Sequence, residues 1–280
     1  MNHTPSANVE QAALWNGPSG RAWVDTQAAI DTMFRPFAET LVEAAAATQA
    51  RHVLDVGCGT GAVTVAIARR LGADGSCTGI DVSAPMLDAA RARAERDSVR
   101  ADFIRADVQT HAFVPAQFDL IVSRLGVMFF DDPVRAFSNL RGAAADGASL
   151  CAIAWRSAAD NPFMTTAERA AAPLLPNLPP RVPGTPGQFA FGDRERVASI
   201  LGASGWTGVD IRPLVVSCVL PAHALTDYVS RLGPVGLALR DVDDETRVRV
   251  VETVCAAFEP YVHGDEVRFD AACWMIGAHR

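Results

Sequence analysis

The stretch VLDVGCGTGAVTVAIA at residues 53–68 restricts the fold more than any other part of the sequence. An apolar run leads into three glycines within five residues, and a helix-type pattern follows. Glycines allow a tight turn and let the backbone approach a ligand closely, while the first turn of the following helix presents free N–H groups. The stretch therefore predicts a strand, a ligand-binding loop and a helix in succession.

The segments after this loop repeat the alternation of strand and helix. Short β-rich runs (SCTGID, DFIRAD, FDLIVS and SLCAIAW) are separated by helix-type runs as far as Trp155. Alternation at this spacing implies right-handed crossovers between parallel strands. We therefore predict an α/β fold whose mostly parallel sheet is covered by helices on both faces.

The pattern changes along the chain and divides it into four segments. The first is helix-type and is interrupted at Asn16-Gly17-Pro18. The third carries six prolines between residues 173 and 192, which excludes a regular helix or a central strand there. We interpret it as an ordered irregular insertion and not as a linker between domains. The expected segments are 1–50, 51–155, 156–192 and 193–280, the last with helices at about 223–260.

The charged residues argue against several classes of function. The formal net charge is −7, and the arginines are scattered among acids, whereas a nucleic-acid-binding protein needs a basic stripe to neutralise phosphates. The chain contains no lysine, so all 25 residues of the Lys+Arg count are arginine. A Schiff-base lysine and a phosphate loop of the G-x-x-x-x-G-K-[ST] type are therefore both excluded.

The cysteines and the hydropathy pattern indicate a cytoplasmic protein. No two of the six cysteines form a C-x-x-C pair, and we find no secretory signal and no apolar run of membrane-spanning length. We expect reduced thiols in the cytoplasm, no metal site and no membrane span. The cysteines are Cys58, Cys77, Cys151, Cys218, Cys255 and Cys273.

The glycine loop by itself fits two kinds of cofactor. Gly57, Gly59 and Gly61, followed by Ala62, satisfy the dinucleotide fingerprint G-x-G-x-x-G/A. Asp81 ends the second predicted strand, twenty residues beyond Gly61, where a carboxylate can hold two ribose hydroxyls. The loop and this acid together establish only a ligand of the nucleotide type.

A second acid distinguishes the two cofactors. Asp55 lies two residues before the first glycine, where its charge would repel a pyrophosphate and attract an ammonium group. S-adenosylmethionine carries such an ammonium, together with a ribose and an adenine. Asp107 ends the third strand and can accept from the adenine amino group, while the Val108 N–H can donate to a ring nitrogen. The acids at the ends of three successive strands therefore indicate S-adenosylmethionine.

Several motifs resemble those of the class I S-adenosylmethionine-dependent methyltransferases. LDVGCGTG is similar to the first motif of the family, GIDVS to its second-strand acid motif and FIRADVQ to its adenine-contact motif. Residues 119–155 resemble the branch that includes the ubiquinone and menaquinone methyltransferases, although Ala145-Asp146-Gly147 replaces the Pro-Gly-Gly turn of that branch. The resemblance covers about residues 10–155, and the last third only in general plan.

This resemblance implies a Rossmann-like, doubly wound, seven-stranded sheet whose last strand is antiparallel. It also implies that residues 1–50 form a helical lid over a cofactor-binding core at 51–155, with further lid helices at about 223–260. Met86 would pack on the adenine, and Trp15, Trp23 and Gln27 would line the lid. The implied cofactor-binding residues are Asp55, Gly57, Gly59, Gly61, Asp81, Val82, Met86, Asp107, Val108, Ser123 and Trp23.

The expected reaction is methyl transfer to an O, N or C atom of a small molecule, such as a secondary metabolite or a quinone-like ring, with S-adenosyl-L-homocysteine as the product. Because the methyl group is already activated, the protein mainly aligns the acceptor and excludes water. Arg124 could orient an acidic substrate or close over the cofactor. Candidates for a general base are His111, His223, His263 and Tyr228, and the sequence selects none of them.

Two other functions stay open from the sequence. An NAD(P)-dependent oxidoreductase fits the glycine fingerprint, but Asp55, Asp107 and the lack of a tyrosine–lysine pair argue against it. A catalytically silent cofactor-binding protein would carry the same motifs. The oligomeric state, monomer or homodimer, is also open.

Overall fold

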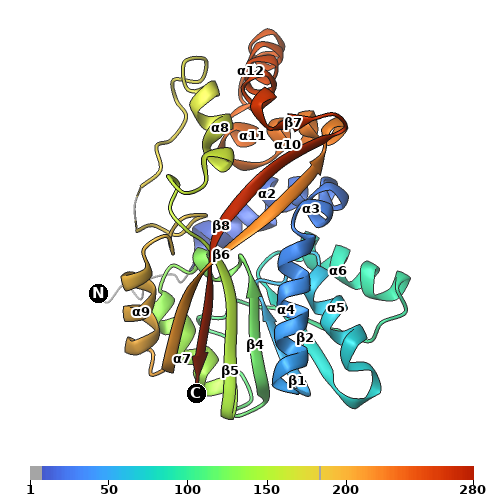
Figure 1. Ribbon diagram of the computed structural model, residues 1–280, viewed down its shortest axis with the longest axis vertical. Helices are drawn as coiled ribbons and strands as arrows, with labels where there is room; N and C mark the ends of the chain where they lie inside the picture. The colour runs from blue at the N-terminus through green and yellow to red at the C-terminus, as the bar shows by residue number, and fades with distance from the viewer. Residues whose placement is uncertain (1–7, 183) are drawn as a thin grey trace.

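The computed structural model describes residues 8–182 and 184–280, and a mixed eight-stranded sheet forms its centre (Figure 1). The strand order is β3-β2-β1-β4-β5-β8-β6, with a short β7 paired to β8. Strands β1 to β5 are parallel to one another, and β8 is antiparallel to both β5 and β6. The strands are β1 (His52–Val56), β2 (Ser76–Asp81), β3 (Asp102–Arg105), β4 (Phe118–Arg124), β5 (Ala144–Trp155), β6 (Thr207–Pro221), β7 (Val262–His263) and β8 (Glu266–His279).

This topology confirms the predicted Rossmann-like sheet with an antiparallel last strand. The additional strand is the two-residue β7, which forms a hairpin with the beginning of β8. In the centre of the sheet, the side chains of Leu54, Ile121 and Val122 are fully buried. Near-continuous apolar runs of this kind are typical of parallel strands that are covered on both faces.

Helices of the α/β core begin at residues whose side chains cap their first turn. Ser83 accepts from the backbone N–H of Met86 at the start of α6, and Asp132 accepts from that of Arg135 at the start of α7. Asp193 does the same for α9, where it accepts two backbone N–H groups. Such caps satisfy donors that have no partner within the helix. The capped helices are α6 (Ala84–Arg96), α7 (Pro133–Ala143) and α9 (Arg194–Ala203), whereas α5 (Ala62–Leu71) begins after Gly61 without a side-chain cap.

Four helices form an N-terminal layer that is fixed to the core. The predicted break lies at Gly17, between α1 and α2. The side chain of Asn16 donates to the carbonyl of Val82 at 2.9 Å and accepts from the N–H of Ala84 at 2.9 Å, which holds the end of α1 beside the end of β2. The layer consists of α1 (Val9–Asn16), α2 (Pro18–Asp25), α3 (Gln27–Met33) and α4 (Arg35–Thr48).

A second helical group stands at the far end of the long strands β6 and β8, which extend beyond the rest of the sheet (Figure 1). Between Ala172 and Gly192, the residues that the structure describes form no helix or strand, in agreement with the prolines there. The group consists of α8 (Pro162–Ala171), α10 (Leu225–Arg231), α11 (Gly233–Ala238) and α12 (Asp244–Ala257), and the short 3₁₀ helices of the chain are Gly72–Asp74, Val127–Phe129, Ala222–Ala224 and Glu259–Tyr261.

An aromatic cluster holds this group to the sheet. The ring of Phe163 in α8 stacks on that of Phe269 in β8, with 3.7 Å between the centroids and 5° between the planes. Its edges contact Phe258 and Tyr261. Because Phe163 is 2% exposed, the contact joins α8 to the sheet through a fully packed side chain.

We expect Phe163→Ala to lower the free energy of unfolding by about 3–5 kcal/mol, because it removes a buried ring and leaves a cavity between α8 and β8. Phe163→Leu should cost less, since most of the volume is retained. Chemical denaturation followed by circular dichroism measures both. Val114→Ala is the control, because Val114 is 64% exposed. Equal stability of Phe163→Ala and the wild type would show that the stacked ring does not anchor α8.

Candidate functional site

A cavity of about 430 Å³ lies at the carboxyl ends of the parallel strands. Loops that follow β1, β2, β3 and β4 form one side of it. Helices of the N-terminal layer and of the α8, α10 and α11 group form the remainder. Strands β1 and β4 are neighbours in the sheet, and the strand order reverses between them, which is where open α/β sheets bind ligands.

The glycine loop adopts a backbone conformation that suits only glycine. Gly57 has φ +65°, and a Cβ atom there would lie 2.8 Å from the Cα atom of Gly126. Gly59 has φ +54°, and its Cβ would lie 2.8 Å from the Cε atom of Met86. Both glycines line the cavity. Gly61 is not among the lining residues; it begins α5, and a Cβ there would meet Ala90. The loop thus combines a close approach to the cavity with tight helix packing.

Asp55 lines the cavity although its side chain is almost entirely buried, with 1% exposure. Its Oδ2 atom accepts the hydroxyl hydrogen of Thr64 at 2.6 Å. Its Oδ1 atom is buried and has no hydrogen-bond partner among the residues that the structure describes. Burial raises the pKa of Asp55 to about 7, against the opposing effects of Thr64 and Arg124. A cation beside Oδ1 would relieve this cost.

The other two predicted acids also line the cavity, and their oxygens are held by neighbouring groups. Asp81 accepts the backbone N–H of Gly59 at 2.8 Å and that of Ser83 at 2.9 Å, and burial raises its pKa. Asp107 accepts the backbone N–H of Gln109 at 2.9 Å, and the amide of Gln109 contacts both carboxylate oxygens. The structure therefore brings together the three acids that the sequence placed at successive strand ends.

Arg124, at the end of β4, is the cationic counterpart of Asp55. It lines the same cavity, and its Nη1 atom is buried without a hydrogen-bond partner in the described part of the chain. Burial lowers the pKa of Arg124, and the nearby carboxylates of Asp31 and Asp55 raise it. No ion pair joins Arg124 directly to either acid among the described residues. Two residues of opposite charge thus line the cavity, and each has a buried polar atom without a hydrogen-bond partner in the described part of the chain.

The remaining predicted residues fall into two sets. Val82, Met86, Val108, Trp15, Trp23 and Tyr228 line the cavity. Outside its lining lie Gly61, Ser123, His111, His223, His263 and Gln27.

Two of the residues outside the lining have other contacts that explain their position. The hydroxyl of Ser123 donates to the carbonyl of Val56 at 2.7 Å and accepts from the N–H of Gly126, so it joins β4 to β1. The ring of His111 packs edge-on against Phe113. The structure therefore does not bring the histidine candidates to the site.

Several lining residues were not identified from the sequence. Most of them lie on helices or in the irregular segment after α8, where apolar residues are equally typical of ordinary core packing. The Arg181–Glu168 ion pair is one example, since the partners are thirteen residues apart and carry no motif. The unidentified lining residues include Asn8, Gln11, Leu14, Ser19, Ile30, Met33, Phe34, Gly126, Met128, Met164, Ala167, Glu168, Arg181, Gln188 and Val235.

The strand order and the position of the cavity together define a Rossmann-like protein. Residues 53–147 match a sequence family described as "Methyltransferase domain". Among curated proteins, aklanonic acid methyltransferase DauC of Streptomyces sp. (strain C5) is 33% identical over 107 residues, which are 38% of this chain and 49% of that protein. Nocamycin O-methyltransferase of Saccharothrix syringae is 34% identical over 100 residues, 35% of this chain and 36% of that protein.

A third relative belongs to the branch that the sequence motifs resemble. Demethylmenaquinone methyltransferase of Lactiplantibacillus plantarum is 34% identical over 104 residues, 36% of this chain and 44% of that protein. The chain spans about half the length of the curated relatives it matches.

Solved structures show the same fold. One described as "Conversion of a Disulfide Bond into a Thioacetal Group during Echinomycin Biosynthesis" has a TM-score of 0.56 at 19% identity, and covers 86% of this chain and 80% of its own. The YcgJ protein from Bacillus subtilis has a TM-score of 0.55 at 14% identity, with 87% and 97% covered. Residues 53–147 thus match a methyltransferase domain, and the predicted resemblance to the class I S-adenosylmethionine-dependent methyltransferases is confirmed.

Within residues 8–182 and 184–280, no group of three or more His, Cys, Asp and Glu side chains is arranged to hold a metal ion. No helix in these ranges combines the length and the apolar character that crossing a membrane requires.

The buried charge of Asp55 should destabilise the folded protein at high pH. Since its folded-state pKa is raised from 3.8 to about 7, the folded state binds the proton more tightly than the unfolded state does. Stability should therefore be lost as pH rises through this range. We expect Asp55→Asn to be more stable than the wild type above pH 7, by about 2–4 kcal/mol, and the difference to vanish at low pH.

Denaturant titrations of both proteins without ligand, at a pH well below and a pH above 7, measure the effect. Asp146→Asn is the matched control, because the Asp146 side chain is 99% exposed. A constant difference between Asp55→Asn and the wild type across the pH range would contradict the raised pKa.

Proposed function

We propose that the protein is an S-adenosylmethionine-dependent methyltransferase that acts on an apolar small molecule. The observation that carries this proposal is the pair of opposite charges in the cavity. Asp55 and Arg124 each present a buried polar atom that has no partner in the described ranges. Leaving such atoms unsatisfied is costly, and a bound zwitterion would satisfy both at once.

The amino-acid end of S-adenosylmethionine is such a zwitterion. Asp55 would hold its ammonium group and Arg124 its carboxylate, with the strong hydrogen bonds that form between ionised partners. A pyrophosphate, in contrast, would meet the charge of Asp55 at this point. The charge pair therefore supports S-adenosylmethionine over a nicotinamide dinucleotide.

Other lining residues fit the remainder of the cofactor. Asp81, at the end of β2, would accept from the ribose hydroxyls. Asp107 would accept from the adenine amino group, the Val108 N–H would donate to the ring, and Met86 would pack on its face. Trp23 and the neighbouring N-terminal helices would cover this end of the cavity. When bound, the cofactor supplies a methyl group that is activated on a positively charged sulfur.

The rest of the cavity favours an apolar acceptor with rings. Its walls carry aromatic side chains from three parts of the chain, which provide a dry surface of fixed shape. These side chains exclude water and hold the acceptor in line with the methyl group. The residues are Phe34, Phe129, Phe130, Trp155, Phe163, Tyr228 and Phe258.

The protein's main contribution is alignment, and the proton that an O–H, N–H or C–H acceptor loses would pass to solvent, because the histidine candidates lie outside the lining. Burial raises the pKa of Tyr228 far above its ordinary value, so its hydroxyl stays protonated; it donates to the Sδ atom of Met164 at 3.6 Å and would donate to the acceptor when one is bound. Glu168 is held through both carboxylate oxygens by Arg181. The names of the relatives that act on aklanonic acid, nocamycin and demethylmenaquinone support a small molecule such as a secondary metabolite or quinone-like ring. The acceptor atom can be O, N or C.

We expect S-adenosylhomocysteine to bind to the wild type, and Asp55→Asn and Arg124→Gln each to weaken binding roughly tenfold to a hundredfold, because each removes a hydrogen bond between charged groups. Methylthioadenosine lacks the amino-acid end, so both variants should bind it as the wild type does. Isothermal titration calorimetry measures all affinities. Arg96→Gln is the matched control, since the Arg96 side chain is 64% exposed and lies outside the cavity.

Failure of the wild type to bind S-adenosylhomocysteine would overturn the proposed function. Equal losses of affinity for both ligands would instead show that the charge pair does not recognise the amino-acid end.

Methyl transfer itself distinguishes an enzyme from a silent cofactor-binding protein. We expect transfer of labelled methyl from S-adenosylmethionine to at least one member of a panel of phenols, aromatic acids and hydroquinones. Tyr228→Phe should lower kcat/KM by roughly tenfold, the value of one hydrogen bond, and leave cofactor binding unchanged. Tight cofactor binding without transfer to any acceptor of the panel would favour the silent protein.

A further inference from the structure

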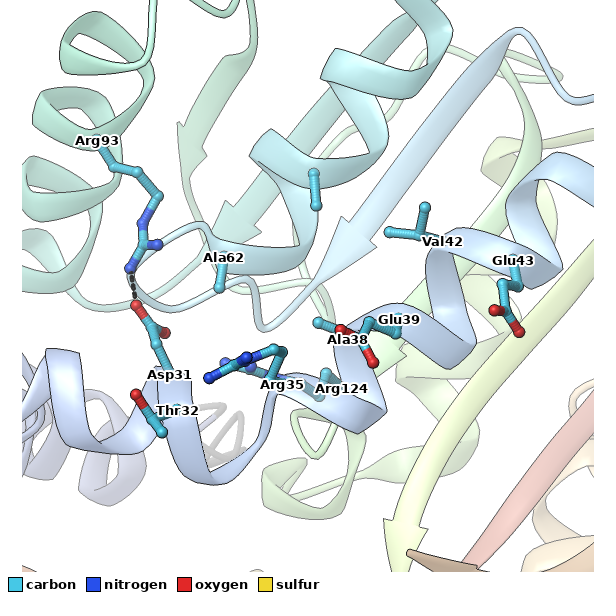
Figure 2. Close-up of a pocket in the computed structure, with 11 residues that line it drawn as sticks. Asp31, Thr32, Arg35, Ala38, Glu39, Val42, Glu43, Ala62, Arg93 and Arg124 are labelled. Carbon is cyan, nitrogen blue, oxygen red and sulfur yellow. Dashed lines mark hydrogen bonds and ion pairs between the residues drawn. The ribbon is translucent and has the colours of Figure 1, made fainter. Parts of the chain in front are cut away.

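A second hollow adjoins the proposed cofactor cavity and shares Arg124 with it. This outer crevice has a volume of about 500 Å³ and lies between helices α3 and α4 on one side and α5 and α6 on the other (Figure 2). Its apolar surface comes from Ala38, Val42, Ala62 and Ala66, and its charged residues are Asp31, Arg35, Glu39, Glu43, Arg93 and Arg124. Arg124 therefore has one side toward the cofactor cavity and another toward the crevice.

An ion pair at the edge of the crevice joins the N-terminal layer to the glycine loop. Asp31, on α3, accepts from the Nη2 atom of Arg93, on α6 (Figure 2). The Nε atom of Arg93 donates to the carbonyl of Thr60 in the loop, at 2.9 Å. The side chains are only 24% and 13% exposed, so solvent screens the pair less than a surface ion pair. Helix α3 and the loop are thus connected through one guanidinium.

The free oxygen of Asp31 extends this arrangement toward Arg124. Oδ2 is bonded to Arg93, whereas Oδ1 is buried and accepts no hydrogen bond from any described residue. Asp31 and Arg124 line the same crevice, and Asp31 is the carboxylate that most strongly favours the charged form of Arg124, ahead of Asp55. Charges therefore alternate from Asp55 through Arg124 and Asp31 to Arg93.

This alternation decides where the guanidinium of Arg124 can lie. With Asp55 as its only neighbouring acid, Arg124 would be drawn onto the unused oxygen of Asp55, because two buried opposite charges attract strongly at short range. That oxygen would then be unavailable to an ammonium group. Asp31 lines the crevice on the other side of Arg124, so its attraction opposes this pull, and both Asp55 Oδ1 and Arg124 Nη1 are buried without a hydrogen-bond partner among the described residues.

We propose that Asp31, itself held by Arg93, is a positioning residue that keeps Arg124 apart from Asp55 and directed at the amino-acid end of the cofactor. Asp31 acts through Arg124 and does not touch the cofactor. The N-terminal helical layer is accordingly a working part of the cofactor site and not only a cover. This inference rests on the proposed function, since it concerns the same cofactor.

The test compares two ligands and a double-mutant cycle by calorimetry. The ligands are S-adenosylhomocysteine and its decarboxylated analogue, which keeps the ammonium group but offers Arg124 no carboxylate. We expect Asp31→Asn to weaken binding of S-adenosylhomocysteine roughly tenfold, and the double variant Asp31→Asn/Arg124→Gln to bind it no more weakly than Arg124→Gln alone. Once Arg124 is absent, Asp31 has nothing to position.

The decarboxylated analogue reports the collapse of Arg124 onto Asp55. Its ammonium must compete with Arg124 in Asp31→Asn, so we expect that variant to bind it more weakly than the wild type and Arg124→Gln to restore the affinity. A merely structural role of Asp31 would produce no such restoration. Asp31→Glu, which keeps the charge, should recover part of the affinity for both ligands.

Glu43→Gln is the matched control, because Glu43 carries the same charge on the same crevice but is exposed. Thermal unfolding of each variant shows whether it is folded at the titration temperature. If Asp31→Asn is unfolded there, the same comparisons are made with Asp31→Glu. Unchanged binding in Asp31→Asn, or additive losses in the double variant, would overturn the inference while leaving the proposed function intact. Absence of binding to the wild type would overturn both.

Discussion

The buried carboxylate of Asp55 is the constraint around which the site is arranged. A charge with 1% exposure and one unsatisfied oxygen is costly unless a cation completes it. Thr64 provides one hydrogen bond from the first turn of α5, and Arg124 provides a positive charge without a direct bond. The folded protein therefore carries an electrostatic cost that the proposed ammonium-bearing ligand would relieve. The buried charge lowers the free energy of unfolding of the protein without ligand, while the site is already arranged for binding.

The sheet geometry explains why the ligand-binding groups meet. Parallel strands end at one edge of the sheet. Because β2, β1 and β4 are neighbours, Asp81, Asp55 and Arg124 come together at that edge. Glycines at 57 and 126 then allow the loops after β1 and β4 to approach each other, since a Cβ on either would lie less than 3 Å from the other backbone. The same tight contact positions Arg124 beside the glycine loop. Backbone packing and ligand recognition thus depend on the same residues.

The sequence predicted those parts of the site that belong to single strands and the loops after them. The alternation of strands and helices predicted the sheet, and the end of each strand located the acids. Ser123 shows the limit of this reasoning: it ends β4 as predicted, but neighbouring residues of a strand point to opposite sides, and its hydroxyl bonds to Val56 instead of facing the cavity. The Asp31–Arg93 pair had no signal at all, because its partners are 62 residues apart on two separate helices.

The Asp31–Arg93 pair gives the N-terminal layer a second role besides covering the cavity. Residues such as Trp15 and Trp23 line the cavity, whereas the charged residues of α3 and α4 line the crevice on the other side. A cover held only by apolar contacts could slide over the core with little change in the cofactor site, because such contacts have no direction. Asp31 adds a directed interaction, because Oδ2 bonds to Arg93 and the charge of the carboxylate favours the charged form of Arg124. Displacement of α3 would therefore alter the balance of charge on Arg124, and through it the affinity for a zwitterion. Asp31 therefore couples the cover to the binding site, in addition to the hydrogen bonds of Asn16 to Val82 and Ala84.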